Sequence, residues 1–152
     1  MNSSAIVSPE DQKVTFVELF FDLVFVFSVT QVVALFHHHL DLKTVGQAIL
    51  VFWLVWWAWT QFTWALNAAN TTNPLIELGT LIATAVAFFM AIALPGAFDE
   101  LAFRFAIPYI VVRSIGLTLY AWVTAQNPAQ AAGVRRFTLV SLSGFIAVLA
   151  GA

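Results

Sequence analysis

Long apolar runs separated by short polar stretches dominate the chain and determine its predicted architecture. Each run approaches the roughly 20 residues that a helix needs to cross a bilayer, at about 1.5 Å of rise per residue. None shows the alternating pattern of a membrane-spanning strand. Because backbone polar groups must be satisfied internally in lipid, we expect an all-α, multi-pass transmembrane helical bundle. Five spans are predicted, at residues 14–36, 45–66, 75–94, 101–122 and 137–152.

The chain divides into a polar N-terminal segment, residues 1–13, and one transmembrane helical domain, residues 14–152. The first apolar run is too long for the core of a signal peptide, so we interpret it as a retained span. Short connections predict that consecutive helices are antiparallel neighbours. The run at 137–152 is short and ends without a polar flank, so we expect the chain to be part of a longer protein.

Composition supports a membrane protein and excludes several functions. The chain is 61% apolar and only 9% charged, against about 25% charged residues in a soluble domain. A net charge of −2 and the lack of a long basic cluster exclude a nucleic-acid partner. The absence of cysteine excludes disulfides and thiolate chemistry. An excess of Lys13, Arg135 and Arg136 over Lys43 and Arg104 favours a cytoplasmic N-terminus.

Two carboxylates interrupt the first span. Glu18 and Asp22 are four residues apart, which places them on one helix face. An aspartate at the centre of a span costs about 2.5–3.5 kcal/mol on insertion scales, so it often marks a functional site. When the antiparallel spans are aligned by depth, further polar residues fall in the same half of the membrane. The resulting candidates for an ion pathway are Glu18, Asp22, Gln61, Glu77 and Arg113.

Two interpretations of this polar cluster stay open. In the structural one, Arg113 pairs with Asp22 or Glu18 and buried hydrogen bonds hold the helices together. In the functional one, the carboxylates take up and release a small cation or a proton, with Arg113 as counter-charge. The surplus of acidic over basic groups favours a cation over an anion.

Aromatic residues cluster in the second span. Its tryptophans fall at helical spacing on one face, together with Thr60. This face either packs against helices and lipid or forms the aromatic wall of a cavity for an apolar or cationic ligand. The candidates for this wall are Trp53, Trp56, Trp57 and Trp64.

No pattern indicates catalysis. A phosphate loop, a nucleophile elbow and a zincin motif are all absent. The adjacent residues His37, His38 and His39 splay by about 100° each on a helix, so they cannot converge on one metal ion. We therefore expect no enzyme, metal or cofactor, with an enzyme acting on lipid as the weakest alternative. The expected partners are the bilayer and a small cation or proton, and a homo-oligomer is compatible with the sequence.

Three segments carry a family resemblance. VTFVELFFDLVFVFSVTQ resembles the opening signature of the bacterial low temperature requirement A (LtrA) membrane proteins. FWLVWWAWTQFTWALNAAN resembles the second span of that family, and AIALPGAF with FAIPYIVVRSIGLTLY resembles its third-to-fourth span region, including Arg113. The resemblance implies the N-terminal portion of a longer multi-pass protein of the bacterial inner membrane. It implies no established activity, so cation or proton transport is our working hypothesis. The alternative is a membrane scaffold or cold-adaptation protein.

Overall fold

Four α-helices form the part of the chain that the computed structural model describes, residues 6–7, 14–37, 40–99 and 102–125. All four are long and apolar enough to cross a membrane. They confirm the first four expected spans, whereas the fifth, 137–152, lies outside the described residues. Short 3₁₀ turns, η1 (Leu35–His37) and η2 (Leu94–Gly96), follow α1 and α3. The helices are α1 (Phe16–Ala34), α2 (Leu42–Ala68), α3 (Pro74–Ala93) and α4 (Phe103–Thr124).

Local polar side chains determine where α2 and α3 begin. The Asp41 carboxylate accepts a hydrogen bond from the backbone N–H of Thr44 at 2.7 Å, which caps α2. The Asn73 side chain accepts one from the N–H of Leu75 at 3.0 Å, and Pro74 occupies the first position of α3. A proline is tolerated there because that N–H has no helical partner. The polar stretches between apolar runs therefore act as helix starts.

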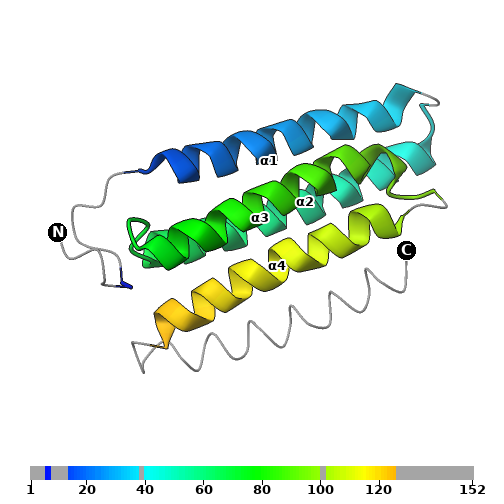
Figure 1. Ribbon diagram of the computed structural model, residues 1–152. Coiled ribbons are helices and arrows are strands. Elements are labelled where there is room, and N and C mark those ends of the chain that lie inside the picture. The colour runs from blue at the N-terminus through cyan, green and yellow to red at the C-terminus, as the bar shows by residue number, and fades with distance from the viewer. Residues whose placement is uncertain (1–5, 8–13, 38–39, 100–101, 126–152) are drawn as a thin grey trace.

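The four helices run alternately up and down (Figure 1). The connection between α2 and α3 lies at one end of the bundle, which we call the Asn70 end. The α1–α2 and α3–α4 connections lie at the other, which we call the Pro95 end. At the Asn70 end, the N–H of Asn70 donates to the carbonyl of Ile6 at 2.7 Å, and Val7 pairs with Ala69 in an antiparallel bridge. Part of the polar N-terminal segment therefore packs on the α2–α3 connection.

The packing order differs from the chain order. The helix α3 packs against α1 and α4, and α2 packs mainly against α4, whereas α2 and α3 barely touch. The expectation that consecutive helices are neighbours is therefore wrong for this pair. Small side chains on α3 explain why this helix packs against both α1 and α4, because small side chains let helix backbones approach closely in a membrane. Those buried on α3 are Thr80, Ala83, Thr84, Ala87 and Ala91.

Candidate functional site

A hydrogen bond between α1 and α2 holds the central carboxylate of the site. The indole Nε1 of Trp59 donates to Asp22 Oδ1 at 2.7 Å. Asp22 lies six residues after the start of α1 and Trp59 nine residues before the end of α2. These offsets correspond to about 9 and 13 Å from the Asn70 end, so the two groups meet within one half of the spans.

Asp22 lies at the surface of the described bundle, where its side chain is exposed. Within the described part of the chain, the hydrogen bond from Trp59 is the one polar contact of the carboxylate. Phe21, its neighbour in sequence, lies about 100° around the helix and is buried in the core at 1% exposure. Asp22 therefore faces outward along the α1–α2 side, with Oδ1 held by an indole.

Glu18 has a different role from the one expected. Its Oε1 accepts hydrogen bonds from the backbone N–H and the hydroxyl of Thr15, at 3.0 and 2.9 Å. In return, the Thr15 hydroxyl accepts from the N–H of Glu18 at 3.4 Å. This reciprocal arrangement is a capping box, which satisfies donors at the start of α1. The pattern Thr-x-x-Glu before an apolar run was the sequence signal for it, and it places Glu18 at the end of the span.

Gln61 and Arg113 form a second polar contact, between α2 and α4. Both residues are buried, at 3% and 4% exposure. The amide Nε2 of Gln61 donates to the backbone carbonyl of Arg113 at 3.2 Å. Beside them, Gly116 allows close approach, because a Cβ there would lie 2.8 Å from Phe62 Cδ2 and 3.4 Å from Gln61 Nε2.

The expected ion pair between Arg113 and an acid of the first span is not among the contacts of the described residues. Asp22 receives its hydrogen bond from Trp59, and Glu18 receives its bonds from Thr15. The reason is topological, because α1 and α4 lie diagonally across the bundle and barely touch. Glu77 stands apart as well, exposed in the first turn of α3. The candidates thus share one half of the spans but do not converge on one point.

The aromatic face of α2 points outward. Trp53, Trp56 and Trp64 are 54%, 42% and 50% exposed. The rings of Trp53 and Trp57 stack with centroids 6.1 Å apart. This face therefore forms an outer surface of the described bundle.

The sequence pattern did not single out Trp59, the hydrogen-bond partner of Asp22. Trp59 is partly buried and packs against the core, at the edge of the helix face that carries the exposed tryptophans. Its position, four residues after Val55 and three before Phe62, follows the buried stripe of the helix. That spacing was the available signal in the sequence.

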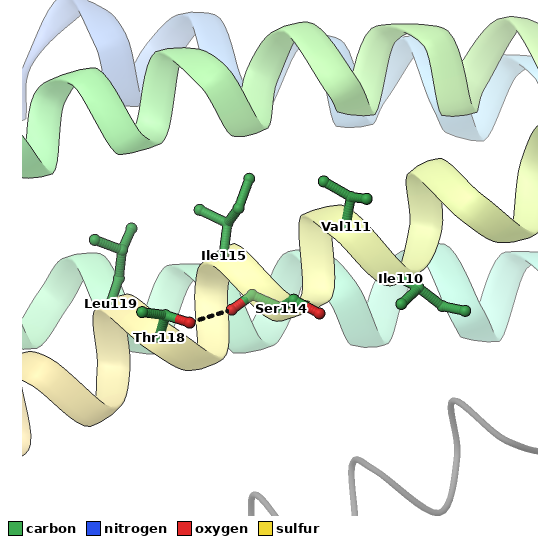
Figure 2. A pocket seen from close by; sticks show the side chains of 6 residues that line it. All are labelled: Ile110, Val111, Ser114, Ile115, Thr118 and Leu119. Atoms are coloured by element: carbon green, nitrogen blue, oxygen red, sulfur yellow. Dashed lines mark hydrogen bonds between the residues drawn. The ribbon is translucent and has the colours of Figure 1, made fainter.

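A shallow apolar hollow of about 330 Å³ lies on α4 (Figure 2). Its lining contains none of the candidate residues. All six lining residues come from α4, and the Thr118 hydroxyl within it donates to the carbonyl of Ser114 at 2.8 Å. Among the described residues, the hollow is a groove between side chains of one helix and brings together no polar side chains from different elements.

These features define a class, a multi-pass α-helical membrane protein with a carboxylate inside its first span. Residues 13–152 match the sequence profile of the family described as bacterial low temperature requirement A protein (LtrA), and the chain belongs to that family. A similar curated protein is "Uncharacterized protein RA0937" of Rhizobium meliloti (strain 1021), 35% identical over 112 residues. That alignment covers 74% of this chain and 27% of the relative, so the chain spans about a quarter of its length. No solved structure matches the chain.

Proposed function

We propose that the chain contributes to a small-cation or proton transport path of the bacterial inner membrane, in which Asp22 takes up and releases the ion. The observation that carries this proposal is the hydrogen bond of 2.7 Å from Trp59 to one oxygen of Asp22. It orients the carboxylate, and the Asp22 side chain as a whole is exposed on α1. In this proposal the protein is not an enzyme, and Asp22 acts as a binding group.

The free-energy cost of a carboxylate within a span, compared with the gain from one hydrogen bond, supports a further ligand for Asp22. An aspartate at the centre of a span costs about 2.5–3.5 kcal/mol on insertion scales, and simulations give larger values for charges on isolated helices. A hydrogen bond between membrane helices returns about 0.6–1.7 kcal/mol. One indole donor therefore offsets only part of the cost and leaves one oxygen to be stabilised. A proton, a small cation or water in a path supplies that stabilisation.

A structural function is the second candidate, and a specific observation favours it. Glu18 is engaged in a capping box, and Gln61 donates to the backbone of Arg113 between two helices. Polar groups of the predicted cluster thus stabilise helix ends and contacts. If Asp22 and Trp59 act in the same way, the protein is a membrane scaffold whose polar residues hold the helices together.

A flux assay in proteoliposomes distinguishes the two functions. The purified protein, and a longer family member with the same first-span motif, are assayed with a pH-sensitive dye and with K⁺ and Na⁺ gradients. Asp22→Asn keeps an oxygen acceptor for the Trp59 indole but removes the charge. We expect it to abolish flux while the protein still inserts and folds.

Two variants serve as controls. Asp41→Asn is the same chemical change at an exposed helix cap, where asparagine caps as well as aspartate, so it keeps wild-type flux. Asp22→Glu restores a carboxylate, and part of the flux returns with it. Absence of flux from both native proteins, or equal flux from Asp22→Asn, contradicts transport and leaves the scaffold.

A further inference from the structure

A second polar site lies at the Pro95 end, far from Asp22. A cavity of about 250 Å³ opens where α1 ends, α2 begins and the α3–α4 connection passes. At roughly 30 Å³ of liquid volume per water molecule, this space equals about eight waters, the size of a small polar headgroup. In the described part of the chain, its polar lining comes from separate elements: Lys43, Thr44, Gln47 and Asp99.

The cavity is lined by one basic and one acidic side chain, which are not paired with each other. Lys43 lies in the first turn of α2, and Asp99 lies in the turn after η2. Neither side chain forms an ion pair or hydrogen bond with another described residue, although both line the same cavity. The backbone N–H of Thr44 is already bonded to Asp41. The polar groups of this site are therefore provided by side chains and not by unpaired backbone N–H groups at the start of α2.

We propose that this cavity binds a zwitterionic phosphoethanolamine group. The ammonium of Lys43 and the donors of Thr44 and Gln47 suit the phosphate, and the Asp99 carboxylate accepts hydrogen bonds from the primary ammonium. A purely anionic group leaves Asp99 without a counter-charge. A quaternary ammonium has no N–H to donate, so it fits Asp99 less well. This inference is independent of the transport proposal.

The position of the cavity favours a lipid headgroup as the source. The ends of membrane-spanning helices lie at the level of the headgroups. Leu35 and Phe98 add apolar surface beside the polar groups, which suits the glycerol and first acyl carbons of a lipid. Free phosphoethanolamine carries the same recognised group, so the experiment includes both.

The test measures binding to the purified, delipidated protein in detergent. Short-chain phosphatidylethanolamine, phosphatidylcholine and phosphatidylglycerol are titrated separately, and free phosphoethanolamine is added as a competitor. We expect phosphatidylethanolamine to bind about tenfold or more tightly than the other two lipids, the factor that one charge-assisted hydrogen bond supplies. Competition by free phosphoethanolamine at similar concentrations identifies a soluble ligand, and its failure to compete identifies the lipid.

Variants connect binding to the cavity. Lys43→Gln and Asp99→Asn each weaken phosphatidylethanolamine binding about tenfold, and Asp99→Asn also removes the preference over phosphatidylcholine. Gln47→Leu, which changes no charge, provides a third variant if either of these fails to fold. Arg104→Gln and Glu77→Gln, exposed charges outside the cavity, leave binding unchanged. Equal binding of all three lipids, or binding unaffected by the cavity variants, overturns the proposal.

Discussion

The contact between α2 and α4 offers a sharp test of the packing, through Gly116→Ala. A Cβ at this position would lie 2.8 Å from Phe62 Cδ2 and 3.2 Å from Phe62 Cε2. Carbon atoms pack best at about 3.5–4.0 Å. The Phe62 ring cannot easily move away, because it is 1% exposed and its centroid lies 4.4 Å from that of Phe21 on α1.

The expected loss of stability follows from two opposing effects. Overpacking of a filled core costs about 1–3 kcal/mol. Replacing a glycine inside a helix by alanine gains about 0.5–1 kcal/mol. The clash is the larger effect, so Gly116→Ala lowers the free energy of unfolding by about 1–2 kcal/mol. The assay is SDS titration of the protein in bicelles, followed by far-UV circular dichroism.

The other helix glycines of the described spans are matched controls. Gly46 has nothing within 4 Å of a built Cβ, and Gly79 meets only Leu119, at an ordinary 3.5 Å. Both alanine substitutions are expected to leave stability unchanged or to raise it. Phe62→Leu combined with Gly116→Ala destabilises by less than the sum of the two single changes, because the smaller side chain relieves the clash. A Gly116→Ala protein as stable as wild type refutes this reasoning.

Two further predictions concern α1. Thr15→Ala removes the capping box and lowers the free energy of unfolding by about 1 kcal/mol, whereas Thr15→Ser keeps it; equal unfolding curves for the two contradict the cap. In a double-mutant cycle, Trp59→Phe and Asp22→Ala show a coupling energy of about 0.6–1.7 kcal/mol, between the mean and the largest value measured for hydrogen bonds between membrane helices. The exposed Trp53→Phe shows no coupling to Asp22→Ala in the same SDS titration, and a coupling of similar size there rules out the specific contact.

The proposed site shows where sequence reasoning succeeds and where it ends. Depth along a helix can be read from residue spacing, so the half of the membrane that holds Asp22, Gln61 and Arg113 was predictable. Partners could not be read in this way, because they depend on how each helix is rotated about its axis. Asp22 meets Trp59, and Arg113 meets Gln61 through its backbone. Each expected partner lay at the right depth but on the wrong side of the bundle.

The sequence by itself determined that the chain is a membrane protein, and it determined four of its spans to within a few residues. Crossing hydrocarbon depends on the length and apolarity of a continuous run, which are properties of linear sequence. Even the start of α1 was encoded locally, in Thr15 and Glu18. Tertiary structure alone decided that α3 packs between α1 and α4 while α2 lies opposite. Lipid surrounds all helices with similar apolarity, so small side chains and a few polar contacts choose the neighbours, and those contacts join residues far apart in sequence.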